Sequence, residues 1–119
     1  VKRILNAIVS NPMMIAGHRR FDTSVIDACS EVKKGPVILK TGAEGVYGAV
    51  LPFLGLGIAL KIDDGALRAS EVAMASILHS LGVFEGLNKR VIRDFRESII
   101  MNASGNTVGV ISATDCLRF

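Results

Sequence analysis

The chain has 119 residues, of which 50% are hydrophobic, and its 14 basic and 11 acidic residues give a formal net charge of +3. This length fits a single domain, and so much apolar material excludes an intrinsically disordered chain. The basic residues occur in short, scattered pairs and only 5% of the residues are aromatic, so no nucleic-acid partner is expected, because such binding needs clustered cations and stacking rings.

The chain shows no pattern for export or for insertion into a membrane. No charged segment followed by an apolar stretch begins it, and its longest uncharged run, residues 46–60, is broken by Pro52 and three glycines. A membrane span needs about 20 apolar residues. Cys29 and Cys116 fit no metal-binding spacing and are expected to be reduced thiols, with a single disulfide as the alternative. We therefore expect a cytoplasmic protein.

The predicted elements begin with an amphipathic helix over residues 1–10. The Asn11–Pro12 pair should end it, because the residue before a proline avoids helical backbone angles. Residues 13–20 are then expected to form a connector. Because the chain begins with Val1 directly inside a helical pattern, we expect a trimmed protein or a fragment of a larger one.

A second helix is predicted over residues 22–30, with Asp22 or Thr23 as its N-cap, because both side chains can accept a hydrogen bond from the start of a helix. Its inner face is formed by apolar side chains at helical spacing: Val25, Ile26 and Cys29. The polar segment 33–36, which contains a Gly-Pro pair, separates this helix from the strands that follow.

Three strands and their turns are predicted next. Residues 36–41 form the first strand, residues 42–45 form a glycine-bearing loop, and residues 46–51 form the second strand. Residues 52–57 contain a proline and two glycines, which suits a hairpin turn, and residues 57–62 form the return strand. Because short turns join these strands, they should pair in antiparallel fashion.

Two further helices are predicted in the second half of the chain. The aspartates of the turn at residues 63–65 can bond their own backbone. The clearest helix covers residues 70–81, with Gly82 at the position where glycine often ends a helix. Asn88 should cap a short helix that reaches about Ser98.

After a turn at residues 102–106, residues 107–112 are the expected last strand. The predicted order is therefore two helices, three strands, two helices and one strand. Consecutive strands joined by turns favour an α+β fold, in which helices flank an antiparallel sheet rather than alternate with parallel strands. Residues 1–119 are expected to form a single segment of such a domain.

The triplet Lys40-Thr41-Gly42 lies at the end of the first predicted strand, before the glycine-bearing loop. A K-T-G strand end is one of the signatures of serine β-lactamases and penicillin-binding proteins. The lysine can move a proton beside a nucleophilic serine and hold a substrate carboxylate. The threonine hydroxyl adds a donor, and glycine lets a substrate lie flat against the strand. Taken alone, three residues are more often an ordinary strand end.

The partner signature of those enzymes, S-x-x-K, occurs as Ser30-Glu31-Val32-Lys33. We do not expect Ser30 to be a nucleophile. It lies at the end of a predicted helix, beside a Gly-Pro break, whereas a nucleophile needs a rigid position that faces the K-T-G strand. The third signature, S-D-N, is absent from the chain.

A longer pattern extends the K-T-G triplet. The runs K-T-G-A-E-G-V at residues 40–46 and G-I-A-L-K-I-D-D-G at residues 57–65, followed by Arg68, resemble the asparaginase II family. The run A-G-H-R-R-F-D-T at residues 16–23 is similar to that family's A-G-x-x-R-F-x-T stretch. The resemblance covers roughly residues 12–82. It implies the C-terminal portion of a serine β-lactamase-like fold, in an enzyme that hydrolyses L-asparagine to L-aspartate and ammonia by serine–lysine chemistry.

The resemblance also implies roles for individual residues. Lys40 would be the catalytic lysine, and Thr41 with Gly42 would line the edge of the substrate site. Glu44 would either bind the α-amino group of the substrate or pair with Arg68 as structural support, and we favour support.

Asp64 and Arg68 are expected to be supporting residues of the same site. The nucleophilic serine would lie upstream of Val1, so this chain alone is expected to be inactive. His18 and His79 have no cysteine or acidic cluster beside them in the sequence, so no metal site and no cofactor are expected in this chain, while a metal site upstream stays open.

The expected partners are a small amide such as L-asparagine and, as protein partner, either the missing N-terminal half or a second copy of the chain. Two alternatives remain open. The first is a non-catalytic binding or structural domain on the same scaffold, which should leave no large apolar face exposed. The second is another serine hydrolase of the penicillin-recognising group, and the A-E-G-V continuation after the triplet argues against it.

Overall fold

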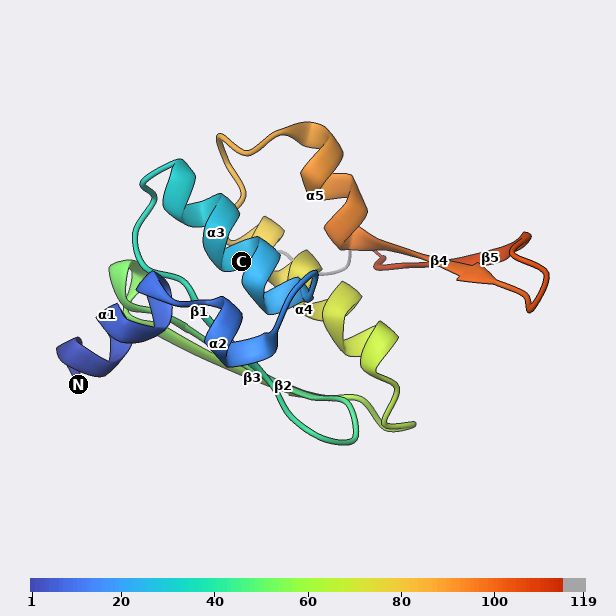
Figure 1. The fold of residues 1–119 in the computed structure, drawn as a ribbon, viewed down its shortest axis with the longest axis horizontal. Coiled ribbons are helices and arrows are strands. Elements are labelled where there is room, and N and C mark those ends of the chain that lie inside the picture. Colours follow the sequence, from blue (N-terminus) through green and yellow to red (C-terminus); the bar gives the residue numbers. More distant parts are fainter. Residues whose placement is uncertain (115–119) are drawn as a thin grey trace.

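The computed structural model describes residues 1–114 and has the expected α+β architecture, with antiparallel sheets of three and two strands (Figure 1). None of the helices in this described range is long and apolar enough to cross a membrane. In chain order the elements are α1 (Lys2–Ser10), α2 (Met13–Ala16), α3 (Phe21–Glu31), β1 (Ile38–Thr41), β2 (Val46–Leu51), the 3₁₀ turn η1 (Pro52–Leu54), β3 (Leu56–Lys61), α4 (Leu67–Ser80), α5 (Lys89–Arg96), β4 (Glu97–Met101) and β5 (Thr107–Ser112).

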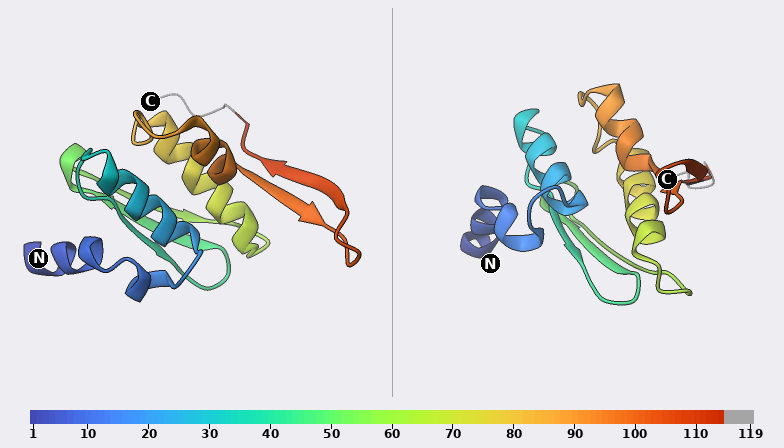
Figure 2. Two further views of the ribbon diagram at one scale, coloured as in Figure 1. Left: turned by 45° about the horizontal axis from the view of Figure 1, so that its top comes forward. Right: turned by 45° about the vertical axis from the view of Figure 1, so that its right-hand side comes forward.

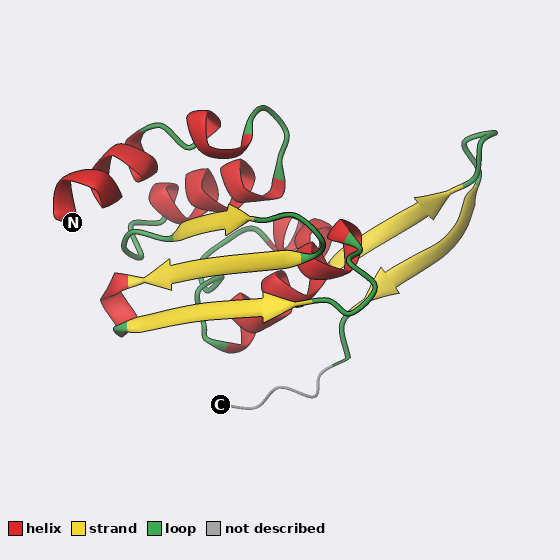
Figure 3. Cartoon of the chain, turned by 90° about the horizontal axis from the view of Figure 1, so that it is seen from below, coloured by secondary structure: helices red, strands yellow, loops and turns green. Residues whose placement is uncertain are grey.

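The larger sheet has the strand order β1-β2-β3, and both pairings are antiparallel. Burial alternates along β2, as expected for a strand with one covered face. Helices α3 and α4 lie behind the three strands in Figure 3, and the opposite face, here called the open face, is turned toward the viewer. The core between helices and sheet is formed by Val25, Ile26, Cys29, Val37, Leu39, Tyr47, Ala49, Leu51, Met74, Ala75, Leu78, Val83 and Phe84.

Helices α1 and α2 lie beside the β1 edge of this sheet, on the side away from α4 (Figure 2). The expected helix over residues 1–10 is confirmed, whereas the expected connector contains the short helix α2. Neither helix has a buried residue, and apolar side chains such as Ile4 and Met14 are exposed. These two helices therefore contribute little to the core.

Strands β4 and β5 form a separate hairpin that projects from the rest of the chain (Figure 1). The predicted last strand at residues 107–112 is confirmed, but it does not join the larger sheet. The helix expected to reach Ser98 ends at Arg96. Residues 97–101 instead form β4, which was not predicted, although Ile99 and Ile100 favour a strand and the segment pairs with β5.

Some predicted helix ends are confirmed and others are wrong. The Asn88 side chain accepts a hydrogen bond from the Arg90 amide at 2.9 Å, as expected of an N-cap. Helix α4 begins at Leu67, three residues before its predicted start. The N-cap of α3 is Arg20, whose side chain makes no capping hydrogen bond. Asp22, predicted as a possible cap of this helix, is instead buried inside its first turn.

Candidate active site

Lys40 lies near the end of β1, one of the two outer strands of the larger sheet. It is the register partner of Gly48 on β2, which in turn is the partner of Ala59 on β3. Leu39, which precedes Lys40 on β1, and Tyr47, which precedes Gly48 on β2, are buried against the helices. Because successive side chains of a strand point to opposite faces, Lys40 lies on the open face. The exposed Lys40 side chain thus lies beside two small residues, Gly48 and Ala59, on this face.

The Lys40 ammonium has no carboxylate partner in the described part of the chain, where the ion pairs are Arg20–Glu71, Lys34–Glu85 and Arg93–Asp94. Its Nζ atom donates instead to the carbonyl oxygen of Thr41 at 2.8 Å. The Thr41 hydroxyl donates to the Gly42 carbonyl at 3.4 Å, at the surface. The polar groups of the triplet are therefore accessible at one strand end, and no ion pair neutralises the lysine.

The loop after the triplet packs directly against the turn at residues 63–65. Gly45 is buried with φ +69°, and its carbonyl accepts a hydrogen bond from the amide of Ile62 at 3.1 Å. A Cβ added at Gly45 would lie 2.9 Å from Cβ of Ile62 and 3.0 Å from the carbonyl carbon of Gly65. No side chain fits there, because real Cβ atoms do not approach so closely. The A-E-G-V run and the D-D-G run therefore pack directly against each other.

Three predicted site residues lie near this contact: Glu44 in the loop, Asp64 in the turn and Arg68 in the first turn of α4. Glu44 is exposed with φ +57°, and the Asp64 carboxylate accepts the amide of Ala66 at 2.8 Å. Arg68 is exposed on α4. Within residues 1–114 the favoured Glu44–Arg68 ion pair does not form. The Asp64 carboxylate thus bonds the backbone of its own turn, while the roles of Glu44, Asp64 and Arg68 in a substrate site stay predictions.

The stretch at residues 16–23 is connected to the triplet by Asp22, which was predicted only as a possible cap of α3. The Thr23 hydroxyl donates to the carbonyl of Gly17 at 2.8 Å, which fixes the chain before α3. Asp22 is fully buried, and its carboxylate accepts the backbone amide of Thr41 at 3.1 Å. A charged residue beside Phe21 on the apolar side of a predicted helix was the signal that could have identified it.

The S-x-x-K segment does not approach the triplet. Asp22 contacts Thr41 from the first turn of α3, and Ser30 lies eight residues further along the same helix, about 12 Å away at 1.5 Å per residue. The Ser30 hydroxyl donates to the carbonyl of Ile26 at 2.8 Å. Lys33 lies beyond the end of the helix with φ +54°. The geometry supports the expectation that Ser30 is not the nucleophile.

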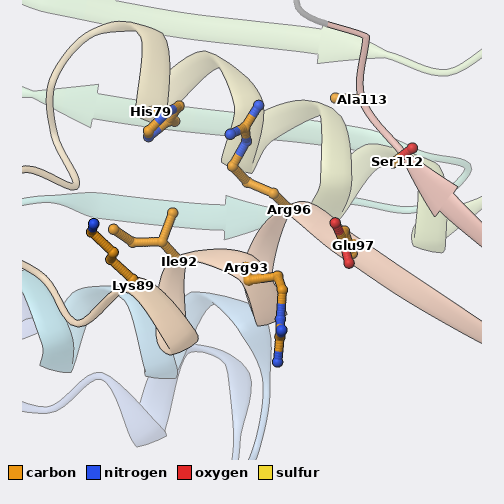
Figure 4. A pocket seen from close by; sticks show the side chains of 8 residues that line it. All are labelled: His79, Lys89, Ile92, Arg93, Arg96, Glu97, Ser112 and Ala113. Atoms are coloured by element: carbon orange, nitrogen blue, oxygen red, sulfur yellow. The ribbon is translucent and has the colours of Figure 1, made fainter.

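A hollow of about 580 Å³ lies between α4, α5 and β5, away from the triplet (Figure 4). It is lined by His79, Lys89, Ile92, Arg93, Arg96, Glu97, Ser112 and Ala113. In Figure 4 Arg96 extends toward the α4 side, whereas Arg93 points away from it. None of the predicted site residues lines this hollow.

The cysteines and histidines form no second reactive centre in the described residues. Burial raises the pKa of the Cys29 thiol to about 11, so this cysteine is an inert core residue. Cys116 lies outside the described residues, so the pairing of the two cysteines stays a prediction. His18 and His79 are exposed, and within residues 1–114 no three His, Cys, Asp or Glu side chains could hold a metal ion.

A K-T-G strand end is one of the signatures of serine β-lactamases and penicillin-binding proteins. The sequence pattern of the L-asparaginase II family matches residues 1–113, nearly the whole chain. The chain therefore belongs to the asparaginase II family, whose members are amidohydrolases of the asparaginase type. No curated protein matches the chain.

Proposed function

We propose that this chain supplies the lysine-bearing part of an L-asparaginase, which hydrolyses L-asparagine to L-aspartate and ammonia on a serine β-lactamase-like scaffold. The nucleophilic serine comes from a segment or polypeptide other than residues 1–119. The observation that carries the proposal is the position of Lys40, which is exposed on the open face, has no carboxylate partner among the described residues and lies beside Gly48 and Ala59.

The proposed reaction has two steps. The serine Oγ attacks the side-chain amide carbon of asparagine, its proton passes through Lys40 to the amide nitrogen, and ammonia leaves. Water then hydrolyses the acyl-serine ester, which releases aspartate and returns the proton to the serine. Thr41 and Gly42, here called the substrate edge, hold the substrate along β1. With no Arg68 partner in the structure, Glu44 is free to bind the α-amino group.

The exposed apolar residues support this proposal over a standalone binding domain. Val46 and Val50 on the open face are 41% and 43% exposed, and further large apolar side chains are exposed at the β2–β3 turn and on α1 and α2: Phe53, Leu54, Leu56, Ile4, Met13 and Met14. Large exposed apolar patches on soluble proteins mark interaction surfaces, so this many exposed apolar side chains favour a covering partner over a standalone domain. A second segment, or a second copy, would cover the open face and bring the serine toward Lys40.

The test is ammonia release from L-asparagine, measured for the chain alone and for the chain mixed with the polypeptide encoded immediately upstream. We expect activity only in the mixture, and Lys40→Ala should lower kcat by at least about a hundredfold, the range for removing a positioned acid–base group. Lys33→Ala is the matched control, since Lys33 is also exposed but lies far from the triplet, and it should keep full activity. Activity of the chain alone that is lost in Ser30→Ala would overturn the proposal in favour of the S-x-x-K segment.

A further inference from the structure

Asp22 is the fully buried acid of the described chain, and it lies directly beneath the substrate edge. A buried carboxylate is costly unless hydrogen bonds compensate for the lost water. One of its oxygens accepts the Thr41 amide, while Oδ2 has no hydrogen-bond partner, and neither has the hydroxyl of Tyr47, which is also buried. Burial, together with the contact of its hydroxyl with the Asp22 side chain, raises the pKa of Tyr47, so these two buried polar groups lie close together.

The hydrogen bond from Thr41 to Asp22 is made at the free edge of the sheet. Gly42 donates to the carbonyl of Val46 on β2 at 2.8 Å, so the Thr41 amide, one residue earlier, points away from β2. An amide in this position on an outer strand usually faces water or pairs with another strand. Here Asp22, in the first turn of α3, binds this amide. The end of β1 is therefore hydrogen-bonded to β2 on one side and to α3 on the other.

The same residue also contacts the proposed catalytic lysine. The Thr41 amide is bound by Asp22 at 3.1 Å, and the Thr41 carbonyl accepts the Lys40 ammonium at 2.8 Å. A shift of Thr41 would therefore move the backbone that lines the substrate and the acceptor that orients Lys40. Positioning errors of about 1 Å are enough to cost a site much of its efficiency.

We propose that Asp22 is a positioning residue, whose buried carboxylate fixes the substrate edge through the Thr41 amide. This inference rests on the proposed function, because it assigns a purpose to the edge that binds the substrate. It also explains why the stretch at residues 16–23 accompanies the K-T-G run: the Thr23 hydroxyl fixes the chain before α3, and Asp22 connects α3 to the strand.

The first measurement is amide hydrogen exchange of the full chain in three variants. In Asp22→Ala the Thr41 amide should exchange about tenfold faster, as expected for losing a hydrogen bond to a charged group, while core amides of α4 keep their rates. Asp22→Asn keeps an acceptor oxygen and nearly the same volume, so it should protect Thr41 better than Asp22→Ala does. Asp27→Ala is the matched control, since Asp27 is exposed on the same helix, and it should leave Thr41 unchanged.

The second measurement is steady-state kinetics of the enzyme assembled with its serine-bearing partner. Because Thr41 both lines the proposed substrate site and orients Lys40, Asp22→Ala should raise KM for L-asparagine about tenfold and should lower kcat in addition. A merely structural role would reduce the active fraction, which lowers kcat and leaves KM unchanged. That result, or unchanged Thr41 exchange in the folded Asp22→Ala variant, would overturn the inference. A wild-type assembly without asparaginase activity would overturn the proposed function instead, and the exchange data would then show only whether Asp22 holds Thr41.

Discussion

The two antiparallel sheets of this chain differ in how they are supported. In the β1-β2-β3 sheet, Leu39, Tyr47 and Leu51 are fully buried beneath α3 and α4. In the β4-β5 hairpin, by contrast, apolar side chains on both strands are exposed: Ile99, Ile100, Met101, Val108 and Val110. A two-stranded hairpin is only marginally stable by itself in water. The comparison indicates that the helix-covered sheet carries the stability and positions the candidate site, whereas the hairpin depends on its attachment to α4 and α5.

The largest contrast should appear when a large apolar side chain is truncated in each sheet. Leu39→Ala removes a fully buried side chain and should lower the free energy of unfolding by about 2–5 kcal/mol. Val110→Ala removes a side chain that is 54% exposed and should change it by less than about 0.5 kcal/mol. Urea unfolding followed by the fluorescence of Tyr47, the only tyrosine in a chain without tryptophan, measures both. Equal losses would show that the hairpin is part of the same cooperative core.

A second contrast compares one turn glycine in each sheet. Gly45 and Gly105 both have positive φ, but an added Cβ at Gly45 would lie 2.9 Å from Cβ of Ile62, while at Gly105 it would meet nothing within 4 Å. Gly45→Ala therefore combines backbone strain with a clash and should cost about 2–4 kcal/mol.

Gly105→Ala adds only the strain of a left-handed backbone and should cost about 1 kcal/mol. The same urea experiment compares these two glycine variants directly. If Gly45→Ala were as mild as Gly105→Ala, the loop at residues 42–45 would not be held rigidly against the turn at residues 63–65.

The smallest effect concerns an ion pair at the far end of the core. Lys34 Nζ lies 2.7 Å from a carboxylate oxygen of Glu85, and this contact lowers the pKa of Glu85. Because the pKa is lower in the folded chain, the pair stabilises the fold above the ordinary pKa of glutamate and stops doing so as the pH falls through the lowered value.

Lys34→Met should therefore weaken the fold slightly at pH 7, and the difference from wild type should disappear at strongly acidic pH. Lys33→Met is the control, since Lys33 is an exposed neighbour outside every ion pair of residues 1–114. The melting temperatures of both variants across pH 3–8 check this expectation. A Lys34→Met deficit that persists in acid would show that packing of the lysine stem, not the ion pair, matters.

The sequence patterns predicted the elements whose signals are local. Residues 46–51 alternate in burial and form a strand with the predicted bounds, and Asn88 caps α5 because its side chain reaches an amide only two residues away. Strand β4 was not predicted, since Glu97 directly follows a charged helical segment; Ile99 and Ile100 favour a strand, but pairing with β5 sets where the helix ends and the strand begins. Local propensity does not contain information about a partner ten residues away.

The candidate site was predictable to the same degree. Lys40 at a strand end, before a glycine loop, could be located from residue order, and the structure places it exposed on the open face; its catalytic role stays a prediction. The Glu44–Arg68 pairing could not be judged from spacing, because it depends on how the loop at residues 42–45 leaves the sheet. Asp22 was misread as a cap, because a carboxylate at a helix start has the same appearance in sequence whether it faces its own helix or another strand.

The sequence by itself determined the α+β class, the order of most helices and strands, and the membership of the K-T-G strand end in a longer family pattern. These features depend on side-chain periodicity and turn residues within a few positions of one another. Only the tertiary structure decided that Gly45 must be a glycine, that Asp22 holds Thr41, and that β4 and β5 stand apart from the main sheet. The physical reason is that each of these is a contact between segments distant in the chain, and its geometry exists only after the helices have packed on the sheet.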